Sequence, residues 1–294
     1  MFDRVLVVDW SANSAPKRGA DSIWIAELHV DESVRNIRIW NPPTRRAAAE
    51  LLSERLDAVR RARTLIGVDF SIGFPTGFAT ALGLAGTPWS STWAFLAERI
   101  ADDHRNRNNR FAVAADLNAC VSGGAAPFWG CPPSARASTL TSTKPVDGAC
   151  LPEWRTTEQE LRTAGCRPFS SWQLLGAGSV GSQTLLGIPV LDRLRRSHRD
   201  VEVWPLSTGL CAVDVAPGGV LVAEVWPSMH QVPETGPEPK DRRQVAAVAA
   251  ALVAADRAGE LPSWFTPTCP AQRVGAVVDE EGWVLGAGLV SEGR

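Results

Sequence analysis

The chain alternates between short runs that are almost entirely apolar and longer stretches that are amphipathic or irregular. Residues 4–10 (RVLVVDW) form a continuous β-branched run, typical of a strand that is buried on both faces. Residues 23–30 and 34–40 follow after short loops and predict two further strands. Connections this short favour an antiparallel meander of the three strands.

A helix and a fourth strand are predicted next. Thr44 is a suitable N-cap for residues 45–63, where apolar side chains recur at helical spacing. Residues 64–70 (TLIGVDF) are again apolar and predict a strand. Because the helix brings the chain back across the sheet, we expect this strand to pair in parallel with an earlier one.

The middle of the chain is less regular. Residues 89–120 have a mostly helical pattern, whereas residues 120–170 are rich in Gly, Pro, Ser and Thr and show no clear period. Irregular insertions of this length are usually functional or mobile. A helical pattern returns over residues 184–198, where Pro189 predicts an interruption, and residues 201–204 predict a short strand.

The last third predicts two hairpins and a helix. Residues 210–215 and 220–226 flank the turn sequence PGG, and residues 277–288 suggest a second, shorter hairpin. Residues 240–256 form an Ala-rich helical pattern between them. With no internal repeat or linker in the sequence, we expect one domain over residues 1–294, with a variable insertion around residues 105–170.

Composition narrows the class of protein. The 294 residues are 45% hydrophobic and 21% charged, as in ordinary globular proteins, and the net charge of −2 excludes a general polycation but allows a local basic groove. The six cysteines lack zinc-site spacing. No signal-peptide pattern and no membrane-length apolar run occur, so we expect a cytoplasmic protein without membrane contact.

Acidic residues end several of the apolar runs. Asp9 ends the first and Asp69 the fourth, and Glu224 repeats the pattern in VLVAEVWP. Asp241 opens the Ala-rich helix. If the strands are adjacent and parallel, these side chains emerge at one sheet edge, where ligands bind in α/β proteins. A buried carboxylate needs a metal, a cation or a set of hydrogen-bond donors.

A cluster of such carboxylates favours Mg²⁺ or Mn²⁺. Two of these ions about 4 Å apart stabilise the attacking and leaving oxygens of phosphodiester hydrolysis. Glu50 on the first helix is a weaker candidate, with which Glu54 competes, and His230 is compatible with a ligand or base. The alternative for each acid is a turn or capping role.

Five segments, in this order, are VVDWS, GVDFSIGFP, AEVWPS, KDRRQVAAVAAAL and EEGWVLGA. Together they resemble an uncharacterised family described as predicted ribonuclease H-like nucleases. The resemblance implies an α/β fold with a mixed five-stranded sheet, three antiparallel strands followed by parallel ones, and helices on both faces. It also implies a metal site formed by Asp9, Asp69, Glu224 and Asp241. Residues 110–169 depart from the family pattern, which leaves nucleic acid and a small phosphorylated compound both open as substrates.

Two other segments suggest ligands. Gly176, Gly178 and Gly181 in GAGSVG have dinucleotide-binding spacing, although a Gly/Ser loop before a helix is the simpler interpretation. Such a loop is still compatible with phosphate binding through backbone N–H groups. DDHRNRNNR (residues 102–110) is dense in donors for phosphate. The functions that compete with a nuclease are therefore a non-catalytic scaffold, a nucleotide-binding protein and a nicotinamide-dependent enzyme.

Overall fold

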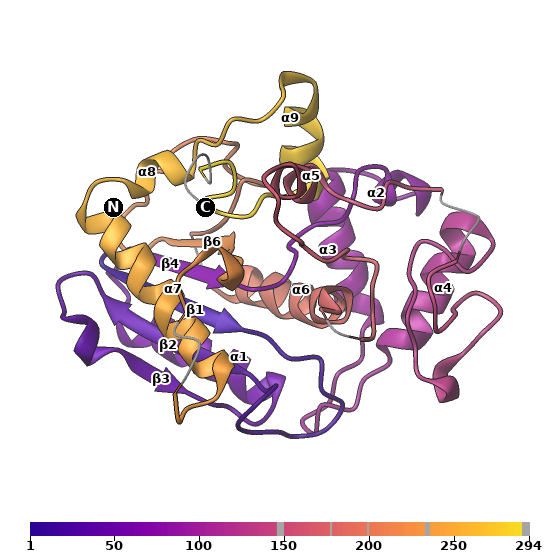
Figure 1. Ribbon diagram of the computed structural model, residues 1–294, viewed down its shortest axis with the longest axis horizontal. Coiled ribbons are helices and arrows are strands. Elements are labelled where there is room, and N and C mark those ends of the chain that lie inside the picture. Colours follow the sequence, from indigo (N-terminus) through magenta and orange to yellow (C-terminus); the bar gives the residue numbers. More distant parts are fainter. Residues whose placement is uncertain (146–149, 177, 199, 233–235, 290–294) are drawn as a thin grey trace.

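A mixed sheet forms the centre of the computed structural model, which describes residues 1–145, 150–176, 178–198, 200–232 and 236–289 (Figure 1). Its six strands lie in the order β3-β2-β1-β4-β6-β5. β1, β2 and β3 are antiparallel, whereas β4, β6 and β5 run parallel to β1. The strands are β1 (Arg4–Asp9), β2 (Trp24–His29), β3 (Arg38–Trp40), β4 (Thr64–Val68), β5 (Val201–Trp204) and β6 (Val220–Glu224).

The three central strands have the apolar sequences that their position requires. Every residue of β1, β4 and β6 is buried, because each strand is covered on both faces and has a hydrogen-bonded strand on both sides. The register pairs Val8 with Val68 and Val68 with Glu224. The parallel pairing of the first and fourth predicted strands is thus confirmed, and their ends lie at one edge of the sheet.

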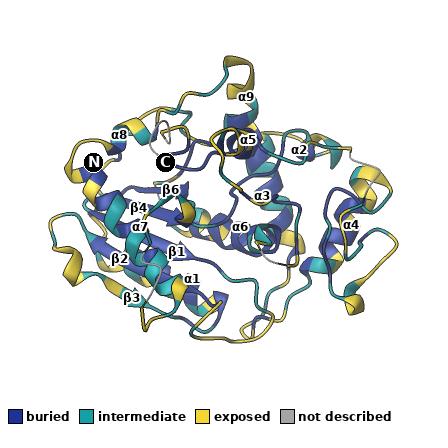
Figure 2. Ribbon diagram, viewed as in Figure 1, coloured by how far each residue is buried: buried dark blue, intermediate teal, exposed yellow. Residues whose placement is uncertain are grey.

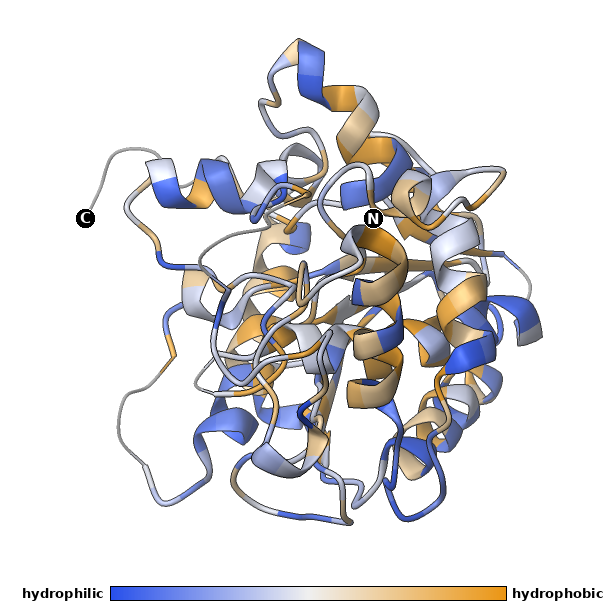
Figure 3. Ribbon diagram, turned by 90° about the vertical axis from the view of Figure 1, so that its right-hand side faces the viewer, coloured by the Kyte–Doolittle hydropathy of each residue, from blue (hydrophilic) through white to orange (hydrophobic). Residues whose placement is uncertain are grey.

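Helices cover both faces of the sheet, as predicted. α1 (Arg45–Ala58), α3 (Pro88–Arg99) and α6 (Val180–Ser197) pack on one face, where Leu6 and Ile66 belong to their hydrophobic cluster. α7 (Lys240–Arg257) packs on the other face, with the cluster that contains Val5 and Leu65. Burial is concentrated in the sheet and on the inner sides of these helices (Figure 2), which carry both apolar and polar residues (Figure 3). The other helices are α2 (Phe78–Ala81), α4 (Arg110–Ser122), α5 (Thr156–Thr163), α8 (Leu261–Trp264) and α9 (Val274–Ala276).

Two helix predictions have different outcomes. α1 begins where predicted, since Thr44 Oγ1 accepts the Ala47 N–H at 3.2 Å. The predicted interruption at Pro189 is wrong, because α6 continues through it. Ile188 and Val190 on either side are buried in the core, and this packing offsets the hydrogen bond that proline cannot make.

Three strand predictions are also wrong. The sheet has six strands rather than five, because β5 adds in parallel outside β6. Residues 210–215 form no strand, and β6 pairs with β4 and β5 instead of closing a hairpin. Residues 277–288 begin with a π-helical turn (Val277–Glu281). An apolar run shows that a strand is buried, but it does not show which strand lies beside it.

The predicted insertion is only partly irregular. It contains α4 and α5, and an aromatic cluster anchors the loops around them. The rings of Phe74, Phe78, Phe128 and Trp172 lie with centroids 4.8–5.8 Å apart. Trp172 is therefore a core residue. Within the described ranges, no helix combines the length and hydropathy of a membrane span.

Gly187 on α6 gives a test of this packing. A Cβ atom at this position would lie 2.3 Å from Cζ of Phe70, which is a severe overlap. We expect Gly187→Ala to lower the free energy of unfolding by roughly 1–3 kcal/mol, as overpacked cores do. Gly275→Ala is the control, since nothing lies within 4 Å of its added Cβ. Urea unfolding compares the two variants, and equal stabilities would contradict this packing of α6.

Candidate functional site

The ends of β1 and β4 bring Asp9 and Asp69 side by side. Asp9 is the last residue of β1, and Asp69 follows β4 directly. The Asp69 N–H donates to the Val8 carbonyl at 3.1 Å, which fixes the two strand ends together. When it is protonated, the Asp9 carboxyl can donate a hydrogen bond to Asp69, and the Trp10 N–H donates to Asp69 Oδ1 at 2.7 Å. The predicted juxtaposition of these two acids at the sheet edge is confirmed.

The pair is electrostatically unusual. Burial raises the pKa of Asp9 well above its ordinary value, and the charges of Asp69 and Asp241 raise it further. Burial also raises the pKa of Asp69 to about 7, although the Trp10 N–H opposes this change. In the described part of the chain neither carboxyl forms a salt bridge, and the charge of Asp241 also raises the pKa of Asp69, whereas the hydrogen bond from Asp9 lowers it. No described residue therefore forms a salt bridge that would compensate the negative charge of this pair when it is ionised.

Asp241 reaches the same site from α7, which covers the face of the sheet opposite to α1 and α6. It lies in the first turn of α7, and its Oδ2 accepts the Asp21 N–H at 2.6 Å. Asp9, Asp69 and Asp241 all line one polar cavity of about 600 Å³. Considering only the residues that the structure places, no three His, Cys, Asp or Glu side chains are grouped closely enough to hold one ion. Asp241 is thus a neighbour of the Asp9–Asp69 pair rather than part of a closed cage.

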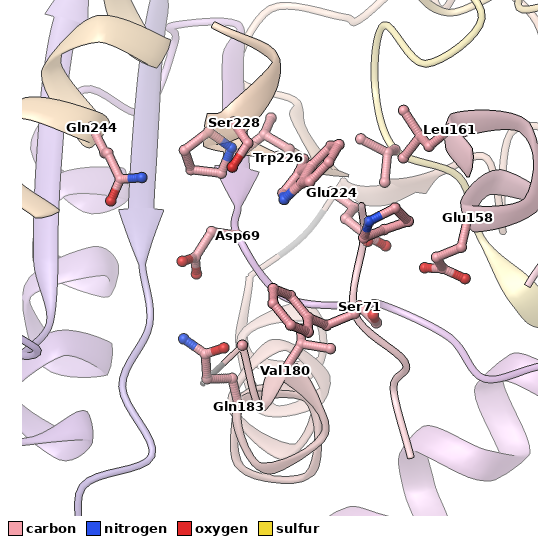
Figure 4. Close-up of a pocket in the computed structure, with 16 residues that line it drawn as sticks. Asp69, Ser71, Glu158, Leu161, Val180, Gln183, Glu224, Trp226, Ser228 and Gln244 are labelled. Atoms are coloured by element: carbon pink, nitrogen blue, oxygen red, sulfur yellow. The ribbon is translucent and has the colours of Figure 1, made fainter. Parts of the chain in front are cut away.

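Glu224 has a different partner from the one predicted. Its carboxylate accepts two hydrogen bonds from Arg155, from Nη1 at 2.7 Å and from Nη2 at 2.6 Å, and a third from the Ile72 N–H at 3.2 Å. Glu224 lines a second, smaller cavity of about 180 Å³. Figure 4 shows it turned toward Glu158, whereas Asp69 points between Gln183 and Gln244. Asp69 also lines this smaller cavity, but the Glu224 carboxylate is paired with Arg155, so we do not carry Glu224 into the proposed metal site.

Arg155 is a central residue that sequence reasoning missed. Its guanidinium is fully buried and forms salt bridges with Glu158 and Glu224. Arg155 also donates to the Glu281 carbonyl at 2.9 Å. The surrounding sequence, EWRTTEQEL, has no feature that distinguishes this arginine from a surface residue. Its role depends on acids that are distant in the sequence.

The EEGWVLGA segment near the end of the chain has a structural role. Both Glu280 oxygens accept backbone N–H groups, from Gly77 at 2.7 Å and Ala79 at 2.6 Å. Glu281 accepts the N–H groups of Thr76 at 3.1 Å and Thr156 at 2.7 Å. These carboxylates therefore satisfy donors at the beginnings of α2 and α5 and tie both helices to the end of the chain.

Two weaker candidates lie outside the cavity. Glu50 has a side chain that is 63% exposed, and it pairs with Arg46 one turn away on α1. The His230 ring stacks on Trp264 with centroids 6.1 Å apart, and burial lowers its pKa. Neither residue lines the cavity that holds Asp9 and Asp69.

The GAGSVG loop does line that cavity, but three of its backbone donors are already used. The N–H groups of Ser179, Val180 and Gly181 bond to the carbonyls of Gly176, Gly178 and Gln173, respectively. A Cβ at Gly181 would lie 2.3 Å from the Ser171 carbonyl, so this glycine permits close packing. Ala177 lies outside the described residues. These contacts favour the Gly/Ser loop over a dinucleotide-binding turn.

One residue of the basic segment DDHRNRNNR lines the cavity. Asp103 pairs with Arg107 at 2.7 Å, and Asp102 pairs with Arg45 at 2.5 Å, so much of the segment's charge is compensated locally. Arg110, at the start of α4, lines the cavity together with Asp9 and Asp69.

Comparison of the chain with models of protein families, with curated proteins and with solved structures finds no match.

The raised pKa values of Asp9 and Asp69 predict how stability depends on pH. A carboxyl whose pKa is higher in the folded than in the unfolded protein stabilises the fold below its unfolded value, and this contribution is lost as pH rises through the folded value. For Asp69 the window runs from 3.8 to about 7. As pH rises through this window, we therefore expect the unfolding free energy of Asp69→Asn to increase relative to that of wild type.

The measurement is urea unfolding at pH 5 and pH 8, with a chelator present. Since one pKa unit corresponds to about 1.4 kcal/mol, we expect Asp69→Asn to be more stable than wild type at pH 8 by a few kcal/mol. Glu50→Gln is the control, because Glu50 is exposed on α1. If wild type is as stable as Asp69→Asn at pH 8, the raised pKa of Asp69 in the folded protein is contradicted.

Proposed function

We propose that this protein is a divalent-metal-dependent phosphodiester hydrolase, a nuclease or phosphodiesterase of ribonuclease H-like fold. The observation that carries the proposal is the buried pair Asp9 and Asp69, which meets at the carboxyl edge of a mixed sheet and forms no salt bridge with any described residue. Uncompensated carboxylates at this edge are typical of catalytic and metal-binding sites.

The donor set fits a hard cation. The pair offers oxygen atoms only, and Mg²⁺ is commonly held by one or two carboxylates while water and substrate phosphate complete its shell. Asp9 and Asp69 would hold Mg²⁺ or Mn²⁺, with Asp241 as a third acid in the same cavity. When bound, such an ion supplies Lewis acidity, which activates water and offsets charge on the phosphate.

The chain's own residues keep the pair in position. The Trp10 N–H orients the Asp69 carboxyl, and Gln183 Nε2 donates to the Trp10 carbonyl at 2.5 Å. Gln183 and Gln244 flank Asp69 in Figure 4 and line both cavities. The hydrogen bond from Trp10 limits the rotation of Asp69. The two glutamines offer amides beside it, where they would hydrogen-bond a substrate or a water.

The arrangement of the strands supports the ribonuclease H-like part of the proposal. Three antiparallel strands are followed by parallel ones, as the family resemblance implies, and the two acids follow the first and fourth strands. β5 is then an addition at the outer edge of the sheet. Fold alone does not determine a reaction, so the proposal depends on the acid pair.

The experiment is hydrolysis of bis(p-nitrophenyl) phosphate and of short 5′-phosphorylated oligonucleotides, with Mn²⁺, Mg²⁺ or a chelator. We expect product with at least one metal and none with chelator. Hydrolysis that is equally fast in the chelator would contradict the proposal. So would a protein that binds the metal but cleaves no phosphodiester offered to it.

A further inference from the structure

Arg110 is a buried residue whose guanidinium is held by side chains from three parts of the chain. Its residue exposure is 7%. Nε donates to Ser182 Oγ at 2.9 Å, and Nη1 donates to Ser14 Oγ at 3.1 Å and to Asn108 Oδ1 at 2.8 Å. The three acceptors come from α6, from the loop after β1 and from the segment before α4. The side chain is therefore fixed in orientation by three separate parts of the chain.

All three of these acceptors are neutral, which distinguishes Arg110 from the other buried arginines. Arg4, Arg45 and Arg155 pair with Glu27, Asp102 and Glu224, respectively. Among the residues with described positions, no acid forms a salt bridge with Arg110. Asp102 acts on it only through space, because both Asp102 oxygens are bound by Arg45. The guanidinium also lies over the Phe111 ring, with Cζ 4.3 Å from the ring centroid. Burying a cation without an acidic partner is nevertheless unfavourable, so a bound anion would stabilise Arg110.

The open side of this guanidinium faces the cavity. The hydrogen bonds of Arg110 use Nε and Nη1, whereas Nη2 donates to no residue of the described chain. Nη2 is also not among the enclosed polar atoms that lack a partner, so it is accessible. Arg110 lines the same 600 Å³ cavity as Asp9 and Asp69. A planar guanidinium with accessible donors matches the geometry of phosphate oxygens.

We propose that Arg110 forms an anion subsite that binds a second phosphate group of the substrate, beside the phosphate that is hydrolysed. The assignment of the neighbouring phosphate rests on the function proposed above. The substrate class is then an ester with at least two phosphates, such as a short oligonucleotide or a 5′-phosphorylated dinucleotide. Its second phosphate supplies the counter-charge that Arg110 lacks.

The direct test uses inorganic phosphate as the probe and isothermal calorimetry on the metal-free full-length protein. Ser14 is exposed and its Oγ already contacts Arg110, so Ser14→Asp would place a carboxylate against the guanidinium without removing it. We expect Ser14→Asp and Arg110→Gln each to weaken phosphate binding about tenfold or more. Arg107→Gln is the control and should bind phosphate as wild type does, because it alters an exposed arginine outside the cavity.

The outcomes separate this subsite from the metal site. Wild type that binds no phosphate, or Ser14→Asp and Arg110→Gln that both bind it as wild type does, would overturn the proposal. Asp69→Asn should retain phosphate binding while losing Mn²⁺. If wild type binds phosphate through Arg110 but binds no Mn²⁺, the subsite stands and the proposed hydrolase fails. If hydrolysis requires Asp69 but phosphate does not bind at Arg110, the proposed hydrolase stands and the subsite fails.

Discussion

Arg155→Met is expected to destabilise the protein by about 3–5 kcal/mol, which is the usual cost of removing one partner from a buried ion pair. The guanidinium is fully enclosed and forms salt bridges with Glu158 and Glu224. Without it, two carboxylates would remain buried with no cation between them. Urea unfolding at neutral pH measures the loss. Arg155→Met should also gain stability as pH falls, because the Glu158 carboxyl, whose pKa is raised by burial, can then be protonated.

The matched control is Arg107→Met. Arg107 pairs with Asp103 at 2.7 Å, but its side chain is 72% exposed. Exposed pairs contribute about 0–1 kcal/mol, so this variant should remain close to wild type. If Arg155→Met is no less stable than Arg107→Met, the buried network around Glu224 is not what holds α5 against the sheet.

Asp9→Asn and Asp69→Asn are each expected to abolish metal-dependent hydrolysis. The loss should exceed the roughly 10–100-fold that follows the removal of an outer contact around a metal. Both variants remove a carboxylate from the pair itself, whereas their metal-free stability should be equal to or higher than that of wild type. Asp241→Asn should have a smaller effect, because Asp241 is engaged by the Asp21 N–H and stands apart from the pair.

Initial rates at saturating Mn²⁺ measure this effect, and thermal unfolding shows that each variant is folded. Glu50→Gln is the control for general loss of negative charge, and its rate should be unchanged. Full activity in both Asp9→Asn and Asp69→Asn would remove the pair from the mechanism. Inactivity accompanied by unfolding would instead assign the two acids a structural role.

The sheet and the acid pair were predictable from the sequence for one physical reason. A strand buried on both faces must be apolar throughout, so the acids at the ends of β1 and β4 stand out. Parallel pairing then places Asp9 and Asp69 at the same edge. The amphipathic pattern also located α1 and α7, because each covers one face of the sheet with one side of the helix.

The features that could not be predicted from the sequence depend on contacts between residues that are far apart along the chain. Glu224 also ends an apolar strand, but its charge is satisfied by Arg155, which lies 69 positions away in the sequence. Arg110 belongs to a segment of several arginines, and only packing decides which of them loses its acidic partner. The parallel pairing of β6 with β5 has the same origin, since the turn sequence between residues 215 and 220 fits a hairpin equally well.

The most direct test of the metal site is calorimetric titration of Mn²⁺ into metal-free wild type, Asp69→Asn and Glu224→Gln at pH 8. We expect saturable binding to wild type, loss of binding in Asp69→Asn, and nearly unchanged affinity in Glu224→Gln, although the last variant should be less stable. Wild type that binds no Mn²⁺, or Asp69→Asn that binds it as tightly as wild type, would contradict a metal site at the Asp9–Asp69 pair.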